Sequence, residues 1–414
     1  MIAIGTLSTS RPRPCNSGTF ARWAIVLFSA LATFAMGGCA GTERLTAVPQ
    51  DMTVRALPLG LANARFFPVT QSAELIAEGT KAVQRQRQAL GLAKDAAMPP
   101  TQFLALSGGG DDGAFGAGLL VGWSDAGNRP EFQLVTGVST GALIAPLAFL
   151  GTRYDPELRA VYTTISADDV YKKRFFTSAL FDDALSDTTP LWLLISRSVD
   201  ERMMADIATE YRKGRLLFIG TTNLDAQRPC LWNIGAIADS GRPGALHLIR
   251  QILRASSAIP GMFEPVLIDV ELDGRKYQEL HVDGGAVAQM FLYPPNITLR
   301  DQPYRNRKAY LILNARENPE WAATEPQTLT IVGRAISTMI KHSGTNDILR
   351  LYATTQRDGV DYNLAAIGDD FTTPHPAGNF DKAYMNAEFD YAYRLARHGY
   401  PWKKAPPQLA ARQN

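Results

Sequence analysis

From Thr101 onward, short apolar runs that end in glycine alternate with longer segments of helical pattern. Phe103 to Leu106 is a short apolar run followed by glycines and then by a helical pattern over about 114–125. Leu134-Val135 precedes a second glycine-flanked turn and an apolar helix that ends near Phe149. Short buried strands that alternate with helices predict an α/β fold with a mainly parallel central sheet. Further strands are predicted at 216–222 and 310–313, and further helices at 246–255 and 384–397.

The region before Thr101 has a different pattern. Residues 72–92 place Ile76, Val83 and Leu90 at helical spacing among basic and polar positions. This spacing predicts a helix that packs on the domain, with contact to a membrane surface as the alternative. Pro99-Pro100 ends the segment, because proline cannot continue a helix.

The first 38 residues have the composition of an export signal. They contain three arginines and no Lys, Asp or Glu, and then an apolar stretch from Trp23 to Met36 that is short for a membrane span. Met36-Gly37-Gly38-Cys39 resembles a bacterial lipobox, which implies that Cys39 is lipidated and that Ala40 favours the outer membrane of a Gram-negative cell. An ordinary secretory signal with a chance cysteine is the alternative.

Removal of this signal changes the charge of the chain. The full sequence has a formal net charge of +2, whereas residues 39–414 hold 39 basic and 40 acidic side chains. No basic stripe with interleaved aromatics is present, so nothing indicates a nucleic-acid partner. Cys230 is the one cysteine left for the folded domain, which predicts a buried apolar residue rather than a disulfide or a metal ligand. The histidines show no metal-ligand spacing, so no metal is expected; they are His247, His281, His342, His375 and His398.

Three short motifs could carry chemistry. Gly137-x-Ser139-x-Gly141 fits a nucleophile elbow, in which a sharp turn from strand to helix exposes the serine hydroxyl. The pattern also arises by chance in chains of this length. Its position after an apolar strand and before an apolar helix is the context that the motif requires.

The second motif is Gly108-Gly109-Gly110-Asp111-Asp112-Gly113, also between a strand and a helix. Successive glycines let backbone amides converge on one point, and the helix N-terminus favours an anion. The spacing formally fits a dinucleotide loop, but no acidic residue ends a second strand at the required distance. A P-loop is excluded because Gly-Lys-Ser/Thr is missing. An oxyanion hole is the interpretation consistent with a serine some 30 residues later.

The third motif is His281-Val282-Asp283-Gly284-Gly285, which places a carboxylate at the end of a predicted strand beside two glycines. Alone it would indicate a turn. Together with the other two motifs, it suggests that Asp283 could accept the Ser139 proton.

A glycine loop, a G-x-S-x-G elbow and a late D-G-G, in this order, resemble the patatin-like phospholipases. Thr222-Asn223-Leu224-Asp225 and Ala255-Ser256-Ser257-Ala258-Ile259-Pro260 also resemble family segments. The resemblance spans about 103–285. It implies a three-layer α/β/α fold, Ser139 as nucleophile, Asp283 as general base and an oxyanion hole at Gly108, Gly109, Gly110 and Asp111. It also implies an ester of a membrane lipid as substrate, without a catalytic histidine, a cofactor or a metal.

The sequence departs from the family in the glycine loop, where members often have Arg or Lys and this chain has Asp111 and Asp112. We expect both carboxylates to point away from the oxyanion hole; their presence weakens the expectation of phospholipid preference more than that of ester hydrolysis. Two alternatives stay open. One is an α/β-hydrolase with a Ser-Asp-His triad that uses His342, His375 or His398. The other is a non-catalytic lipoprotein that retains the fold.

These observations predict four segments: a lipoprotein signal peptide (1–38), a tether and N-terminal helix (39–100), a catalytic domain (101–315) and a C-terminal helical extension packed on the domain (316–414).

Overall fold

The computed structural model describes residues 44–173, 186–299, 306–319, 321, 323–376 and 378–410. The predicted signal peptide and Cys39 lie outside these residues. The described residues from Arg44 onward form one compact unit. Within them, no helix is long and apolar enough to cross a bilayer.

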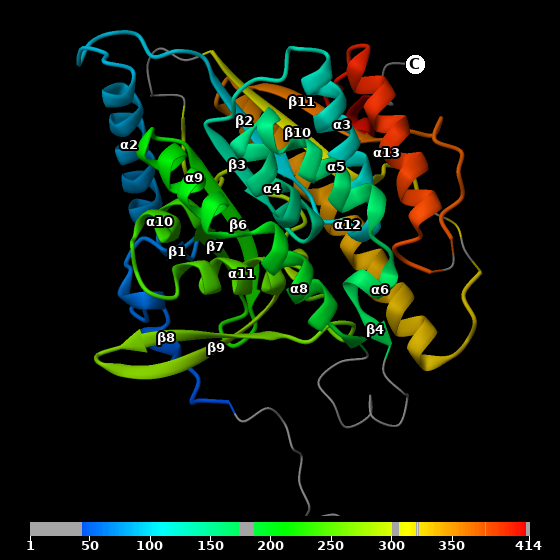
Figure 1. The fold of residues 1–414 in the computed structure, drawn as a ribbon, viewed down its shortest axis with the longest axis horizontal. Coiled ribbons are helices and arrows are strands. Elements are labelled where there is room, and N and C mark those ends of the chain that lie inside the picture. Colours follow the sequence, from blue (N-terminus) through cyan, green and yellow to red (C-terminus); the bar gives the residue numbers. More distant parts are fainter. Residues whose placement is uncertain are drawn as a thin grey trace, which may run out of the picture. The chain divides into compact units, whose positions relative to one another are not determined.

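A nine-stranded mixed sheet forms the centre of this unit (Figure 1). Its strands are β1 (Arg65–Phe66), β2 (Thr101–Leu106), β3 (Leu134–Gly137), β6 (Leu216–Asn223), β7 (Arg228–Asn233), β8 (Val266–Leu272), β9 (Arg275–Asp283), β10 (Arg307–Arg316) and β11 (Asp361–Ile367). The neighbouring strands β6, β3, β2, β10 and β11 pair in parallel. β7 and β1 extend the β6 edge in antiparallel orientation.

Helices cover both faces of the sheet. They are α2 (Ser72–Ala89), α3 (Gly113–Asp125), α4 (Thr140–Leu150), α5 (Asp155–Thr164), α6 (Ala167–Val170), α8 (Thr189–Ser198), α9 (Glu201–Arg212), α10 (Ile234–Asp239), α11 (Ala245–Ser256), α12 (Thr328–Arg357), α13 (Lys382–Arg397) and α14 (Pro407–Ala410). Short elements complete the structure: β4 (Lys172–Lys173) pairs with β5 (Ser186–Asp187), and 3-10 turns cover Gln50–Met52, Pro58–Gly60, Gly110–Asp112, Thr152–Tyr154 and Gly284–Ala286.

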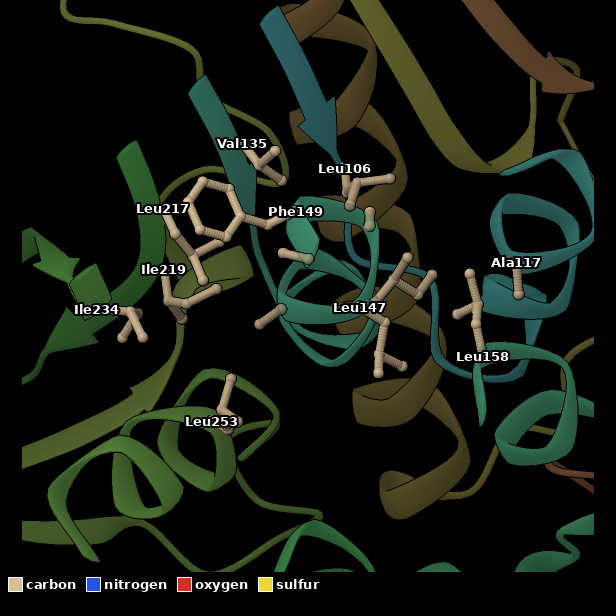
Figure 2. Close-up of a cluster of buried hydrophobic side chains, with 14 of the residues drawn as sticks. Leu106, Ala117, Val135, Leu147, Phe149, Leu158, Leu217, Ile219, Ile234 and Leu253 are labelled. Atoms are coloured by element: carbon tan, nitrogen blue, oxygen red, sulfur yellow. The ribbon is translucent and has the colours of Figure 1, made fainter. Parts of the chain in front are cut away.

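The core divides along the two faces because successive strand residues point to opposite sides. In β2, Leu104 and Leu106 join the larger cluster with α3 and α4, whereas Phe103 and Ala105 join a second cluster with α12. Figure 2 shows Phe149 of α4 near Val135 of β3 and Leu217 of β6 within the larger cluster. The predicted three-layer α/β/α architecture with a mainly parallel sheet is therefore confirmed.

The C-terminal segment is built into the same unit. β11 lies within the segment predicted to be a helical extension and pairs in parallel with β10 at the sheet edge. α13 lies along α3 (Figure 1). A Cβ at Gly118 or Gly122 of α3 would come within 2.2 or 2.3 Å of the Phe389 or Tyr393 carbonyl oxygen, respectively, so these two glycines allow the close helix contact.

Cys230 is fully buried in β7, as expected from its isolation in the sequence. Burial raises the pKa of its thiol to about 12. The thiol therefore stays protonated and acts as a packing group.

A buried ion pair ties the N-terminal segment to the β8–β9 hairpin. The guanidinium of Arg65 in β1 binds both carboxylate oxygens of Glu279 in β9, and the two side chains are 4% and 1% exposed. Arg65 also donates to the carbonyl oxygens of Thr53 and Ala56. The pair thus joins β1, β9 and the segment before β1.

We expect Arg65→Met to lower the free energy of unfolding by about 3–5 kcal/mol, because the substitution leaves a buried charge on Glu279 without its partner. Urea denaturation measures the loss. The double variant Arg65→Met/Glu279→Gln should recover part of it, since no uncompensated charge remains. A double variant less stable than the single one would contradict this explanation.

Candidate functional site

Ser139 occupies a strained turn between β3 and α4. Its φ of 54° and ψ of −125° lie in a region that residues with a side chain rarely adopt. Gly141 makes the turn possible, because a Cβ there would come within 2.4 Å of the Leu106 carbonyl oxygen. The Ser139 amide donates to the Ser256 hydroxyl at 3.0 Å, and that hydroxyl donates to the Gly220 carbonyl at 2.7 Å. Local packing and a hydrogen-bonded brace from α11 therefore hold the predicted elbow in place.

The strand register brings Asp283 to this turn. On one side of β6, β3 pairs up to Gly137 opposite Ile219. On the same side, β9 then pairs from Asp283 opposite Thr221, while β7 occupies the other side of β6. β9 thus takes the place of β3 beside β6, beyond the point where β3 ends. Ser139 follows β3 and Asp283 ends β9, so the two residues meet.

The Asp283 carboxylate accepts hydrogen bonds from the Ser139 side chain and from the Gly285 amide, the latter at 2.7 Å. Burial raises the pKa of Asp283 from 3.8 to about 7, and these two hydrogen bonds oppose the rise. The backbone of Asp283 is fixed as well: its amide donates to the Ala258 carbonyl at 2.9 Å, and the Thr222 hydroxyl donates to its carbonyl at 3.0 Å. The site therefore holds a buried carboxyl group that ionises near neutral pH.

The glycine loop lies beside Ser139. A Cβ added to Gly108 would be 3.1 Å from the Ser139 Cβ. Gly109 approaches β10 so closely that a Cβ there would be 1.9 Å from the Asn314 carbonyl oxygen. Gly110 and Asp111 begin the 3-10 turn Gly110–Asp112, so their N–H groups precede the first N–H that donates within the turn, that of Asp112. The Gly108 amide, in contrast, donates to the Gln289 carbonyl at 3.1 Å.

The carboxylates of Asp111 and Asp112 bind to the C-terminal segment, consistent with the expectation that they point away from Ser139. Asp111 accepts the Phe380 amide at 2.7 Å and pairs with the His375 ring at 3.3 Å. Asp112 accepts the Tyr384 hydroxyl at 3.0 Å. The hydrogen bond to Asp111 raises the pKa of His375 to about 9.

These three residues are also a group that could hold a metal ion, since ligand atoms of Asp111, Asp112 and His375 lie within 4.8 Å of one another. The carboxylate oxygens of Asp111 and Asp112 already accept hydrogen bonds from protein groups. Glu388 is fully buried beside them, and burial and the charges of Asp112 and Asp111 raise its pKa well above the usual range. A protonated Glu388 adds no charge to this group, and a cationic His375 offsets one of the two carboxylate charges.

Among the described residues, no histidine hydrogen-bonds to Ser139 or Asp283. His281, close in sequence, is buried and bonds to Thr221 and Glu279. His375 pairs with Asp111, and His398 bonds to the Arg394 carbonyl.

Sequence reasoning missed the residues that support the site. Ser256 and Thr222 lie in the two segments noted for their family resemblance, but only the folded chain gives them partners. Gln289 and Asn314, which pack on the glycine loop, carried no signal in the sequence.

An α/β sheet with a strained serine after a parallel strand, and a buried carboxylate against its hydroxyl, has the geometry of a serine hydrolase site. Residues 104–294 match the family model of patatin-like phospholipases. Residues 104–294 are therefore a patatin-like phospholipase domain. The match to this family supports lipid acyl hydrolase activity as a general class.

Among solved structures, the chain is similar to VipD from Legionella pneumophila, with 10% sequence identity and a TM-score of 0.36, over 73% of this chain and 67% of that chain. No curated protein matches the chain.

The raised pKa of Asp283 predicts an effect of pH on stability. The folded state binds the proton more tightly than the unfolded state, so this group lowers stability as pH rises from about 4 to about 7. Asp283→Asn removes the ionisation. We expect the difference in melting temperature, Asp283→Asn minus wild type, to be larger at pH 8 than at pH 4.

Thermal unfolding at the two pH values measures this difference. Asp269→Asn, at an exposed position of β8, is the matched control and should show no such change. An Asp283→Asn difference that is equal at both pH values would rule out a buried carboxyl with a raised pKa.

Proposed function

We propose that this protein hydrolyses carboxylic esters of membrane lipids, with Ser139 as nucleophile and Asp283 as general base. The observation that carries the proposal is that the strained Ser139 follows β3 at the point where Asp283 ends β9, which brings its side chain to a buried carboxylate with a pKa of about 7. A general base is most effective when its pKa lies near the working pH. The match of residues 104–294 to patatin-like phospholipases supports a lipid ester as the substrate class.

The proposed reaction has two halves. Asp283 takes the proton as the Ser139 Oγ attacks the ester carbonyl carbon, and the alkoxy group then leaves with a proton from Asp283. In the second half, Asp283 takes a proton from a water molecule as the water attacks the acyl-enzyme carbonyl, and it then gives that proton to the departing Ser139 Oγ as the carboxylic acid is released. The amides of Gly109, Gly110 and Asp111 would stabilise the tetrahedral oxyanion. The Gly108 amide is left out of this set because it already donates to Gln289.

The Ser-Asp-His triad is less well supported than the dyad. The three downstream histidines that it would require are His342, His375 and His398, and none of them hydrogen-bonds to Asp283 among the described residues. The non-catalytic alternative does not account for a strained serine that bonds to a buried carboxylate, since both features cost stability.

We expect Ser139→Ala and Asp283→Asn each to lower kcat/KM for a p-nitrophenyl ester by about 10⁴-fold or more, as loss of a nucleophile or its base does in other serine hydrolases. His342→Ala, His375→Ala and His398→Ala should keep most of the wild-type rate. The wild-type rate should rise with pH through about 7, because Asp283 acts as a base only when ionised.

A fluorophosphonate probe followed by mass spectrometry tests the nucleophile directly, with the label expected on Ser139. Loss of activity in one histidine variant alone would favour the triad. Folded wild-type protein that neither reacts with the probe nor cleaves esters would favour the non-catalytic alternative.

We further propose that Cys39 carries a lipid anchor that holds the enzyme at the cell envelope, in the outer membrane of a Gram-negative cell. The support is the lipobox-like sequence Met36-Gly37-Gly38-Cys39 after a short apolar stretch. A tethered enzyme would meet lipid esters at its own membrane or at an apposed one.

We expect Cys39→Ser, expressed as the full chain in a Gram-negative host, to lose both metabolic labelling with palmitate and recovery in the membrane fraction. Cys15→Ser is the matched control, since Cys15 lies within the signal, and it should behave as wild type. Equal labelling of Cys39→Ser and wild type would refute lipidation at Cys39.

A further inference from the structure

Four side chains with metal-ligating groups meet where the C-terminal segment contacts the glycine loop. This carboxylate–histidine cluster consists of Asp111 and Asp112 from the glycine loop, His375 from the segment between β11 and α13, and Glu388 from α13. Ligand atoms of Asp111, Asp112 and His375 lie within 4.8 Å of one another. The Tyr384 hydroxyl connects Glu388 to this group, because it lies 3.0 Å from an Asp112 oxygen and 3.3 Å from a Glu388 oxygen.

The His375 ring is oriented as a metal ligand would be. Its Nδ1 lies 2.8 Å from the Pro376 carbonyl oxygen, and since a carbonyl oxygen can only accept, Nδ1 carries a proton. The other nitrogen, Nε2, faces the two carboxylate oxygens of Asp111 at 3.3 and 3.4 Å. In the neutral ring, Nε2 is thus an acceptor that faces acceptors. Histidines that bind a metal through one nitrogen commonly donate from the other to a backbone carbonyl, as His375 does.

Glu388 gives an independent reason for a cation at this place. The residue is 0% exposed, and its Oε2 atom has no hydrogen-bond donor within the part of the chain that the structure describes. Its carboxyl group lies against that of Asp112, so here too an acceptor faces an acceptor. A buried oxygen without a donor costs free energy, and an ion between the two carboxyl groups would remove that cost.

We propose that the carboxylate–histidine cluster binds a divalent transition-metal ion, Zn²⁺ or Mn²⁺. Carboxylate oxygens together with an imidazole nitrogen suit these ions, whereas Mg²⁺ and Ca²⁺ take oxygen ligands. A single ion would satisfy both acceptor contacts and displace the protons that His375 and Glu388 hold in its absence. The donors show no ligand spacing along the chain because Asp111 and His375 are 264 residues apart.

The ion would strengthen an attachment that the chain already makes. The Phe380 amide, which lies between His375 and α13, donates to Asp111 at 2.7 Å. The ion would bond the same segment, and α13 itself, to the turn that carries the Gly110 and Asp111 amides. It takes no part in the proposed ester reaction. Binding and stability are therefore the readouts, and the proposal does not depend on the proposed function.

The test titrates ZnCl₂ and MnCl₂ into the full chain, purified without a histidine tag, treated with EDTA and dialysed. By isothermal titration calorimetry we expect saturable binding of a single ion per chain. The melting temperature should rise with ion concentration, because an ion that binds only the folded state stabilises it by mass action. His375→Gln and Glu388→Gln should each weaken binding by at least about tenfold, since loss of even a group that supports a ligand has effects of this order.

His398→Gln and Asp390→Asn are the matched controls and should bind the ion as wild type does. His398 bonds to a backbone carbonyl, and Asp390 is exposed on the same helix as Glu388. His375 is partly exposed, so its variant tests the site even if the change at the buried Glu388 impairs folding. The absence of saturable binding to wild type at millimolar concentration, or equal affinity of wild type and both site variants, would overturn the proposal.

Discussion

The reversal of the chain at Ser139 is the constraint on which the site depends. A residue with a side chain at φ 54° and ψ −125° costs on the order of 1–3 kcal/mol and persists only where the surroundings enforce it. Here the enforcement is specific. Gly141 lets α4 start directly against the end of β2, and Ser256 links the Ser139 amide to the Gly220 carbonyl in β6. Contacts with β2, β6 and α11 therefore hold the strained conformation of Ser139 in place.

The second constraint is the burial of Asp283, which depends on elements far from it in sequence. Asp283 ends β9, and the β8–β9 hairpin is held by two guanidinium groups from the N-terminal segment. Arg65 binds Glu279 in β9, and Arg44 binds Asp225, which also accepts the Leu280 amide. Residues 44–66 precede the segment that matches the family model. They nevertheless help to hold the hairpin that places the carboxylate at Ser139.

The parts of the fold and the site that could be predicted from the sequence are those set by local interactions. The elements around the three motifs were predicted well, because each combines an apolar run with a glycine turn: β2, β3, α3, α4 and the end of β9 all lie where the pattern placed them. The predicted helix over 72–92 is confirmed as α2, which covers Ser72–Ala89.

What the sequence did not predict depends on tertiary contact. The strand β11 and the helix α12 lie in the segment interpreted as a helical extension, although Gly359 and Gly368 flank β11. β9 pairs with β6 just beyond the point where β3 ends. This placement depends on the register of two strands, β3 and β9, that are about 145 residues apart in the chain. Gln289 and Asp347 meet only because α12 folds back on the chain after Asp283. No local pattern encodes such contacts.

The acidic pair Asp111 and Asp112 in the glycine loop departs from the family pattern for a physical reason. Members of the family often have a cation in this loop, where a positive charge would assist an oxyanion. In this chain, Asp111 and Asp112 instead receive the Phe380 amide, the His375 ring and the Tyr384 hydroxyl. All three partners belong to the C-terminal segment that leads into and forms α13. Since α13 also packs on α3 through Gly118 and Gly122, the loop and the helix that follows it are both attached to the same segment. The two carboxylates thus attach the C-terminal segment to the glycine loop of the domain.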